Sequence, residues 1–448
     1  MDPVFSALST HFSTLMAREQ PEKLVVGLSG GLDSVVLLHS LTQLSRSGEL
    51  AVPPIEAVYV NHGLSANAGD WQQFCARVCK ELDVSFTAIA VEVTPRARES
   101  LEACARDRRY AALCEHAKAA KSVIVTAHHQ NDQLETLLLQ LKRGAGPKGL
   151  SGIPAFSVMY SVPVSRPLLP LSRAQILAYA EQNGLRWIED ESNSDESFDR
   201  NFLRHSVLPS LLGRWPSFGQ TASRSAGLCA EQQGLLDEVC DERLEALCDK
   251  PGGISVNGLN AASPAWQRAL LRRWLELNKV AMPGIRQLTQ IQQMLAARPD
   301  GQPHIVLGNA QLRRYQDTLY CLDAGQQPWS FNTVRFATQE YVAIEPQQQK
   351  LMVGKQQGGD LCSVSVAAAE NRFSLSQPVL SLAVKPAGEA HHKPLKQWFK
   401  QWQVPPWERS DWLLLSDAEQ PLALVGKGRI IALCATGQQQ FSLQLYAL

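Results

Sequence analysis

The residues best suited to chemistry lie near the N-terminus, in the run Ser29-Gly30-Gly31-Leu32-Asp33-Ser34. Apolar residues precede and follow this run, which predicts a buried strand, a tight glycine turn and a helix that begins near Ser34. Adjacent glycines let backbone N–H groups approach an anion closely, and the helix N-terminus adds partial positive charge. Asp33 beside such a turn is suited to hold Mg²⁺. No lysine follows the glycines, so the GxxxxGK[ST] nucleotide loop does not fit, and an ordinary strand–turn–helix connection is the alternative interpretation.

A second group of polar residues follows another apolar run, at His128-His129 and in the helix expected from Asp132 onward. Asn131 is a favourable N-cap for this helix. Asp132 and Glu135 lie three residues apart, so both carboxylates share a face at the positive end of the helix, where they stay ionised and can hold an ammonium group or a metal. A zinc site at His128, His129 and Asp132 is disfavoured, because adjacent histidines on a strand point to opposite faces. An ordinary acidic first turn is the alternative.

Three further segments carry charges that fit either phosphate contacts or an ordinary solvated surface. The first is a stripe along one face of a predicted helix, formed by Glu102, Arg106, Arg109 and Tyr110. The second, residues 142–152, is a basic, glycine-rich loop that cannot bury a core, so it is either a flexible connection or a mobile phosphate-binding flap. The third, residues 189–205, is acidic at its start and basic at its end.

Short apolar runs that alternate with helical patterns, between Lys23 and Ile188, must position these residues. Strands are expected at 23–28, 55–60, 85–91 and 122–126. Helices are expected at 34–44, 70–82, 101–120, 132–142 and 173–183. This alternation predicts an α/β fold with a doubly wound, Rossmann-like parallel sheet. Ligands bind beyond the carboxyl ends of strands in such sheets, so we expect segments 29–34, 61–63 and 127–129 to meet there.

Composition sets the broad class of the protein. The chain has 448 residues, 45% hydrophobic and 19% charged, which fits two to four globular domains of about 100–200 residues each. No apolar stretch approaches the ~20 residues of a membrane span, and residues 1–20 lack a signal pattern, so we expect a cytoplasmic protein without a membrane partner. The ten cysteines form no CxxC pair, and Cys75 and Cys79 are interpreted as core thiols. Because the net charge is zero, contacts with nucleic acid must come from local basic patches.

Changes in residue composition and hydrophobic pattern along the chain predict three domains, at residues 1–215, 216–325 and 330–448. In the middle domain, helices over 221–297 precede short strands at 304–307 and 311–322. The last domain is expected to be a small α/β domain, in which one basic helix at 394–402 lies among strand-like runs. Those runs are 363–367, 380–384, 430–433 and 441–446. We interpret the aromatic residues of the basic helix as core, because duplex RNA is read by shape and backbone.

The motifs, in this order and spacing, resemble those of the tRNA(Ile)-lysidine synthetases, a family of N-type ATP pyrophosphatases in the PP-loop superfamily. The matching segments are SGGxDS at 29–34, VNHGL at 60–64, EAxARxxRY at 102–110, AHHxxDQxET at 127–136, RGxGxxGLxG at 143–152, RPLL at 166–169, EDxSNxD with RNxxRH at 189–205, and LKxWxxxxxVPPWxR at 395–409. The chain departs from the family pattern at Ser65, where arginine is usual, and at Glu408 and Ser410. The last two changes affect the segment expected to dock tRNA and leave the catalytic motifs intact.

The resemblance implies that free L-lysine is ligated to carbon 2 of the wobble cytidine in the CAU anticodon of tRNA(Ile). ATP, with Mg²⁺, would adenylate the carbonyl oxygen at that carbon and release pyrophosphate. The ε-amine of lysine would then displace AMP. The product, lysidine, changes codon reading from AUG to AUA. A homodimer is one assembly compatible with this reading.

The same resemblance implies roles for individual residues. The implied catalytic residues are Asp33, Arg109, Asp132 and Glu135. ATP would be bound by Ser29, Gly30, Gly31, Leu32, Asp33, Ser34, His62 and His128. Asp33 would hold the metal, while Asp132 and Glu135 would hold the lysine ammonium. The tRNA would be contacted by Arg143, Arg200, Arg204, Lys393, Lys396, Lys400 and Arg409.

Three other functions stay open at this point. A tRNA thiolase of the same superfamily generally needs reactive cysteines or an iron–sulfur site, often in CxxC pairs, which this chain lacks. A small-molecule ligase of the same fold would leave the large C-terminal half unexplained. A non-enzymatic tRNA-binding relic would have no need to keep Asp33, Asp132 and Glu135.

Overall fold

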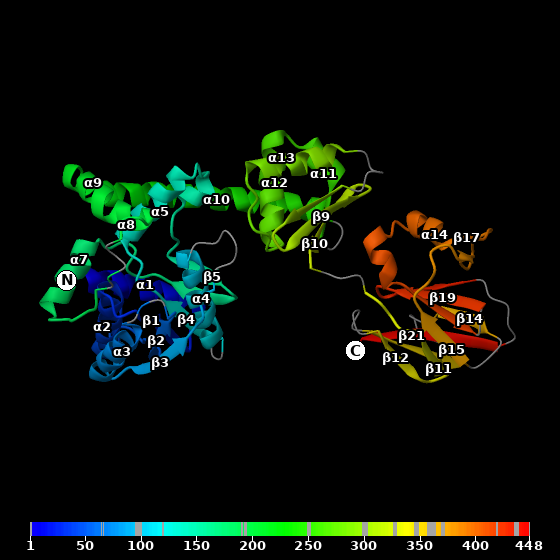
Figure 1. Ribbon diagram of the computed structural model, residues 1–448, viewed down its shortest axis with the longest axis horizontal. Coiled ribbons are helices and arrows are strands. Elements are labelled where there is room, and N and C mark those ends of the chain that lie inside the picture. Colours follow the sequence, from blue (N-terminus) through cyan, green and yellow to red (C-terminus); the bar gives the residue numbers. More distant parts are fainter. Residues whose placement is uncertain are drawn as a thin grey trace. The chain divides into compact units, whose positions relative to one another are not determined.

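The structure, a computed structural model, describes residues 2–447 except 64, 66, 95–100, 119–120, 190, 192–194, 249–251, 298–302, 326–328, 345–348, 356–363, 369–371, 418–419 and 434–438. The chain forms two compact units, Met1–Val239 and Cys240–Leu448 (Figure 1). Among the described residues, no helix is both long enough and apolar enough to cross a membrane.

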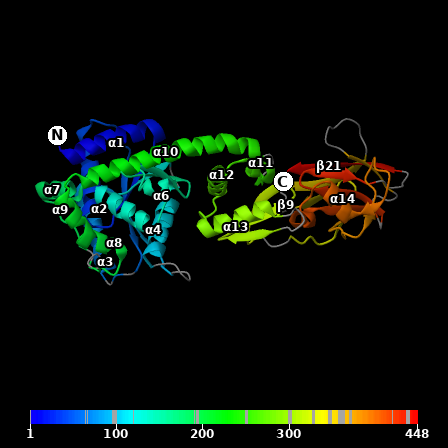
Figure 2. The ribbon, with the colours of Figure 1, turned by 90° about the horizontal axis from the view of Figure 1, so that it is seen from above.

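The first unit alternates strands and helices, as the sequence predicts. Its strands are β1 (Lys23–Gly27), β2 (Ile55–Asn61), β3 (Ser85–Ala90), β4 (Ser122–Val125), β5 (Phe156–Met159) and β6 (Val162–Ser165). Its helices are α1 (Pro3–Glu19), α2 (Leu32–Ser47), α3 (Ala68–Leu82), α4 (Leu101–Ala117), α5 (Gln130–Lys142), α6 (Pro147–Leu150) and α7 (Arg173–Gln182). They are followed by α8 (Asp199–Phe202), the π-helical turn η2 (Leu203–Val207), α9 (Leu208–Arg214) and α10 (Phe218–Leu247), a single long helix (Figure 2).

Six strands of this unit form one sheet in the order β3-β2-β1-β4-β6-β5. The strands β3, β2, β1, β4 and β6 are parallel, and β5 pairs antiparallel with β6 at the edge. The chain starts at β1, moves outward to β3 and then returns through α4 to β4 on the other side of β1. The predicted doubly wound parallel sheet is therefore confirmed. Its direction reverses between β1 and β4, which is where ligands bind in such sheets.

Alternate residues of the central strands enter two separate cores. Leu24 and Val26 of β1 pack with α1, α2 and α7 on one face of the sheet. Val25, between them, packs with Tyr110 and Leu113 of α4 on the other face. Both faces are covered, so the strands consist of nearly continuous apolar residues. The sheet therefore gives a rigid frame to the loops at its carboxyl edge.

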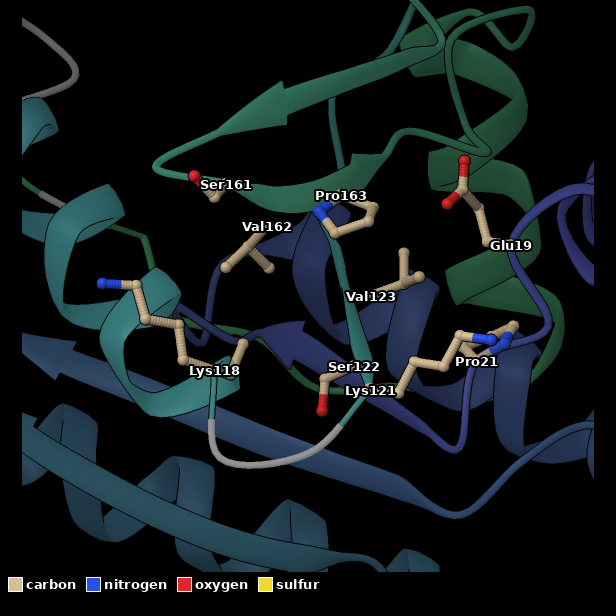
Figure 3. A pocket seen from close by; sticks show the side chains of 10 residues that line it. Glu19, Pro21, Lys118, Lys121, Ser122, Val123, Ser161, Val162 and Pro163 are labelled. Carbon is tan, nitrogen blue, oxygen red and sulfur yellow. The ribbon is translucent and has the colours of Figure 1, made fainter. Parts of the chain in front are cut away.

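The hairpin β5–β6 at the sheet edge is an element that the sequence did not predict. Tyr160 and Ser161 form its turn with positive φ angles of 48° and 67°. A cavity of about 240 Å³ lies beside this turn (Figure 3). Ser122 and Val162, the first residues of β4 and β6, line it. The cavity thus lies at the amino edge of the parallel strands, opposite to the edge that carries the predicted site.

The second unit begins inside α10, at Cys240, and contains the helices α11 (Val256–Ala261), α12 (Pro264–Leu277) and α13 (Ile285–Ala296). They pack on a sheet of order β7-β10-β9-β8, built from β7 (Gly253–Ser255), β8 (His304–Leu307), β9 (Ala310–Tyr315) and β10 (Thr318–Asp323). The strands at 304–307 and 311–322 are confirmed here, with a turn that divides the second into β9 and β10. The mainly helical character predicted for this region is also confirmed.

The rest of the second unit is rich in strands. One sheet has the order β11-β15-β18-β19-β20, from β11 (Val334–Ala337), β15 (Arg372–Ser376), β18 (Leu413–Asp417), β19 (Gln420–Gly426) and β20 (Arg429–Ala432). The other has the order β12-β13-β21-β14, from β12 (Tyr341–Ile344), β13 (Gln349–Lys355), β21 (Gln439–Ala447) and β14 (Val364–Ala368). The two sheets share one apolar core. Of the strand predicted at 380–384, only β16 (Ala383–Val384) is present, paired with β17 (Lys393–Pro394).

The predicted basic helix is α14 (Leu395–Gln401), and its aromatic residues are core. Trp398 and Phe399 are fully buried. The rings of Trp398 and Trp402 stack at a centroid distance of 5.7 Å, and Trp402 stacks on Trp412 at 6.5 Å. These indoles anchor α14 to the strands of its domain, which agrees with their interpretation as core.

Candidate functional site

The glycine turn joins β1 to α2 and presents the open N-terminus of that helix. Gly31 is the N-cap and has no side chain to cap the N–H groups of the first turn, so these groups can bind an anion. The Ser34 hydroxyl donates to the Gly31 carbonyl (2.9 Å) and accepts from the Ser29 N–H (3.2 Å). The Ser29 hydroxyl lies 3.1 Å from the Ser34 hydroxyl, so both serine side chains stabilise the turn. The helix begins at Leu32 rather than at Ser34.

Gly30 is required by its backbone and by its neighbours. Its φ is +85°, and a Cβ at this position would lie 3.1 Å from Ile188 Cδ1 and 3.2 Å from Cys75 Sγ. The Ile188 N–H donates to the Gly30 carbonyl at 2.9 Å. Ile188 thus closes over the turn from a distant part of the chain. The sequence pattern identified the glycine but gave no signal for this contact.

His129 connects the glycine turn to α5. Its Nε2 lies 3.5 Å from Asp33 Oδ2 and 3.6 Å from Asp132 Oδ2. Burial alone would lower the pKa of His129, but the carboxylates of Asp132 and Asp33 raise it above its usual value. Burial alone would raise the pKa of Asp132, but the two neighbouring histidines, His129 and His128, bring it below the usual range. The two carboxylates therefore favour a proton on Nε2, the ring nitrogen that faces both of them. His129 was not among the predicted site residues.

The N-cap of α5 is His129, so the prediction of Asn131 was wrong. The His129 Nδ1 accepts from the Asn131 N–H (3.2 Å), and the His129 N–H donates to Asp132 Oδ2 (2.9 Å), which forms a capping box. The Asn131 side chain instead accepts from the Arg173 N–H at 3.1 Å. This arrangement fixes the Asp132 carboxylate at the start of the helix.

His128, in contrast to His129, favours the neutral form. Its Nδ1 pairs with Thr126 Oγ1 at 3.0 Å. Burial lowers the pKa of His128 to about 3, against the attraction of Asp132, and Arg106 and Arg166 lower it further. His128 is therefore neutral near pH 7 and offers hydrogen bonds rather than charge. His62 follows β2 at the same sheet edge, so it and His128 flank the glycine turn from the two neighbouring strands.

Glu135 is fully buried, with 0% of its surface exposed, and is held by two arginines. Arg200 Nε donates to its Oε2 (3.1 Å), and Arg204 donates through Nε to Oε1 (2.8 Å) and through Nη2 to Oε2 (3.1 Å). Arg204 Nη2 also lies 3.6 Å from Asp132 Oδ1. Four predicted site residues thus meet, although the pairing among them was not predicted.

Of the stripe on α4, Arg106 and Arg109 are half-buried and Tyr110 is buried, whereas the Glu102 side chain lies outside the described residues. The guanidinium carbons of Arg106 and Arg109 lie 5.3 and 5.6 Å from the centre of the Tyr110 ring, which is itself buried. Burial lowers the pKa of Arg109, with Asp132 acting in the opposite direction. The Arg109 guanidinium therefore interacts electrostatically with the Asp132 carboxylate on α5.

The remaining predicted residues are Arg143, at the end of α5, and four basic residues of the second unit. Arg143 is the exposed C-cap of α5, and at 1.5 Å per residue its backbone is about 16 Å from that of Asp132. In the second unit, Lys396 and Lys400 are exposed on one face of α14. Lys393 Nζ lies 4.5 Å from the centre of the Trp398 ring, and Arg409 Nε donates to the Val404 carbonyl (3.2 Å). Leu64 and part of the acidic segment, at 190 and 192–194, lie outside the described residues.

Comparison with known proteins assigns all three regions of the chain. A PP-loop domain family matches residues 5–211, a TilS substrate binding domain matches 254–320, and a TilS substrate C-terminal domain matches 377–445. A tRNA(Ile)-lysidine synthase of Pectobacterium atrosepticum is 40% identical over 413 residues, covering 90% of each chain. The enzymes of that name from Proteus mirabilis and Vibrio cholerae are each 35% identical, covering 95% and 90% of both chains. The chain belongs to the tRNA(Ile)-lysidine synthase family of PP-loop ligases.

Proposed function

We propose that this chain uses ATP to join free L-lysine to carbon 2 of the wobble cytidine in the CAU anticodon of tRNA(Ile). One observation carries the proposal: the glycine turn and the start of α5 meet at His129, whose Nε2 lies 3.5 Å from Asp33 Oδ2 and 3.6 Å from Asp132 Oδ2. A phosphate cradle thus adjoins a carboxylate that can hold a cation. The names of the relatives support tRNA(Ile) as the substrate.

In the first step, the carbonyl oxygen at carbon 2 attacks the α-phosphorus of ATP, and pyrophosphate leaves. The N–H groups at the start of α2 would hold the leaving pyrophosphate, because a helix N-terminus stabilises negative charge. The turn, from Ser29 to Ser34, has no lysine to reach a γ-phosphate. Cleavage between the α- and β-phosphates therefore suits it better than γ-phosphoryl transfer.

Mg²⁺ fits the turn through Asp33. The Asp33 Oδ1 atom is buried and has no hydrogen-bond partner. A carboxylate oxygen is a preferred Mg²⁺ ligand, and phosphate oxygens and water usually complete the shell. Within the described ranges, no group of three or more His, Cys, Asp or Glu side chains could hold a metal alone. Bound there, Mg²⁺ would neutralise charge on the phosphates.

In the second step, the ε-amine of lysine attacks carbon 2, and AMP leaves with the former carbonyl oxygen. The ammonium form must first lose a proton to a base. Asp132 is the proposed direct partner of the ammonium, since it is partly exposed and His129 holds its pKa low despite its burial. Glu135 is proposed to act beside Asp132 in the lysine site, and its two arginines hold its carboxylate in place.

Phosphate contacts with the tRNA are proposed for five basic residues, namely Arg143, Lys393, Lys396, Lys400 and Arg409. Arg200 and Arg204, predicted with them, donate instead to the buried Glu135. Such phosphate contacts position a substrate without reading its bases. Replacing the two exposed lysines of α14, Lys396 and Lys400, by alanine should weaken every tRNA alike. It should also make the salt dependence of binding shallower by about 0.7–0.9 per lost contact. An unaltered salt slope would assign α14 a structural role only.

The environment of Cys75, which lies beside the glycine turn, argues against the rival thiolase activity. Cys75 is buried, and its Sγ would lie 3.2 Å from a Cβ at Gly30. Burial raises the pKa of the Cys75 thiol to about 12. A thiol in that environment stays protonated and is a poor nucleophile. An amine nucleophile supplied by free lysine needs no such cysteine.

The test is mass spectrometry of the wobble nucleoside. The full chain is incubated with ATP, isotopically labelled lysine and an unmodified tRNA(Ile) transcript, which is then digested to nucleosides. The proposal predicts a wobble cytidine heavier by one labelled lysine minus one water. A transcript with uridine at the wobble position is the control and should gain nothing. An unmodified cytidine, under conditions where the tRNA is bound, would contradict the proposal.

A further inference from the structure

The sheet of β7 to β10 has two different faces. Leu312 of β9 and Leu319 of β10 are fully buried in the core that this sheet shares with α11, α12 and α13 (Figure 1). Successive residues of a strand point to opposite faces, so Arg313 and Tyr315 lie on the other face of β9. Tyr320 lies on that face too, because it pairs directly with Arg313 across the two strands. Three large side chains thus occupy the face that points away from the helices.

Trp407, from a later part of the same unit, packs on this second face. Its ring centre lies 5.4 Å from that of Tyr320 and 6.2 Å from that of Tyr315, with an edge-to-face geometry in both pairs. The guanidinium carbon of Arg313 lies 5.4 Å from the centre of the indole. Both tyrosines are buried. Aromatic pairs of this geometry and an arginine over an indole attract one another beyond the effect of burial.

Trp407 is fixed to the helix that carries two of the proposed tRNA contacts. It lies on η5 (Pro406–Asp411), a short 3₁₀ helix that follows α14 in the chain. Trp412, the C-cap of η5, stacks on Trp402 at the end of α14. Glu408 Oε1, beside Trp407, pairs with Lys427 Nζ at 2.7 Å. Trp407 and α14 are therefore held in one arrangement, so the place of the indole sets the place of α14.

The indole contact joins two regions that match different families. Tyr315 and Tyr320 lie in the region matched by the TilS substrate binding domain, whereas Trp407 lies in the region matched by the TilS substrate C-terminal domain. Among the described residues, the buried Trp407 Nε1 has no hydrogen-bond partner. A buried N–H without a partner costs free energy, so the contact depends on the ring of Trp407 and not on its N–H.

We propose that Trp407 is a positioning residue for tRNA binding, which fixes the C-terminal domain on the substrate binding domain so that both contact one tRNA. This inference rests on the proposed function and adds to it a residue outside the reaction centre. Two domains held in a preset orientation need not be ordered when the tRNA binds, which favours tighter binding. Lys396 and Lys400 of α14 would contact the tRNA phosphates in that orientation.

The first measurement uses the full chain without RNA. Spin labels are attached to non-natural amino acids at Gln290 of α13 and Gln397 of α14, both exposed positions. The wild type should give a narrow distribution of distances between the labels, and Trp407→Ala a broad one. Trp407→Phe keeps an aromatic ring against both tyrosines and loses the unpaired N–H, so its distribution should stay narrow. An equally narrow distribution in Trp407→Ala would overturn the proposal.

The second measurement is the affinity and turnover of tRNA(Ile). Two aromatic contacts supply an equilibrium constant of about 5 to 150, so Trp407→Ala should raise the KM for tRNA by up to that factor. The kcat and the KM for ATP should not change. Replacing Lys396 and Lys400 by alanine should weaken binding by a smaller factor in the Trp407→Ala background than in the wild type. Tyr341→Ala, at an exposed aromatic of the same unit, is the matched control and should behave as the wild type.

The outcomes separate this inference from the proposed function. If Trp407→Ala broadens the distances but leaves tRNA binding unchanged, while the wild type forms lysidine, the contact is structural only and the function stands. Independent effects of the tryptophan and lysine substitutions would overturn the inference in the same way. If the wild type binds tRNA(Ile) without forming lysidine, the proposed function fails, whereas an affinity that depends on Trp407 would still support the positioning role.

Discussion

Gln133 holds the glycine-rich loop against α5, and its replacement should open that loop. Its Oε1 accepts from the Ile153 N–H (2.5 Å), and its Nε2 donates to the Ile153 carbonyl (3.2 Å). Gly152 has a φ of +67°, and a Cβ there would lie 2.5 Å from Gln133 Oε1. The amide thus fills the space that this glycine leaves. The loop it holds, residues 143–152, includes the proposed phosphate contact Arg143.

The free energy that keeps the loop closed can be worked out from these two hydrogen bonds. Each contributes about 0.5–1.5 kcal/mol net, and groups that are only partly buried regain water when a bond is lost, so the pair contributes about 2 kcal/mol. A change of about 2 kcal/mol shifts the ratio of open to closed loop by about 30-fold. Gln133→Leu removes both bonds. Gln133→Glu sets a carboxylate oxygen against the Ile153 carbonyl, so it should open the loop at least as far.

The assay is hydrogen exchange at the Ile153 amide, which the glutamine protects directly. Exchange should be about 30-fold faster in Gln133→Leu, while amides in the sheet keep their rates. Gln73→Leu, at an exposed position on α3, is the matched control and should behave as the wild type. The KM for tRNA should rise in Gln133→Leu and the KM for ATP should not. Unchanged exchange at Ile153 in both Gln133 variants would refute the proposed clamp.

Three further predictions follow from the site and the core. Asp132→Asn should raise the KM for lysine by about 10- to 150-fold, because a charge-assisted hydrogen bond contributes ~1.5–3 kcal/mol; an equal rise in the KM for ATP would contradict the role of Asp132. The pKa of His129 is raised, so the stability it adds is fully present below its unfolded pKa of about 6.5 and is lost as pH rises through the folded pKa. Urea unfolding of His129→Gln should therefore show its largest deficit near pH 6, and a deficit that grows with pH would exclude this ion pairing. Gly426→Ala should lower the Tm and the near-UV circular dichroism of the second unit, since its Cβ would lie 2.7 Å from Trp412 Cδ2 and overpacking costs about 1–3 kcal/mol; a wild-type Tm would show that Trp412 moves freely.

Most strands and helices of the first unit could be predicted, because each leaves a hydrophobic pattern within a short stretch of sequence. The strand expected at 23–28 is Lys23–Gly27, and the helix expected at 173–183 is Arg173–Gln182. Buried parallel strands give continuous apolar runs, and helices give a regular period. The hairpin β5–β6 was missed because its strands are short and its turn, Tyr160-Ser161, contains neither glycine nor asparagine although both residues have positive φ.

The pairing inside the site could not be predicted, because it depends on contacts between distant parts of the chain. Glu135 and its partners Arg200 and Arg204 are 65 and 69 residues apart in sequence. The same holds for Asn131, which was predicted to cap α5. His129 is the N-cap instead, and Asn131 contacts Arg173, 42 residues away. Sequence patterns thus located the edge of the sheet and the residue types there, whereas tertiary packing decided which charges neutralise one another.

The central claim is that ATP activates the carbonyl oxygen at carbon 2 of the wobble cytidine. Its most direct test is a tRNA(Ile) transcript with ¹⁸O at that oxygen, incubated with the full chain, ATP and lysine. The account predicts that lysidine and AMP form in equal amounts and that the AMP phosphate carries the ¹⁸O, because the bond from carbon 2 to that oxygen breaks when lysine attacks. Unlabelled AMP accompanying lysidine, or ADP as the nucleotide product, would contradict the account.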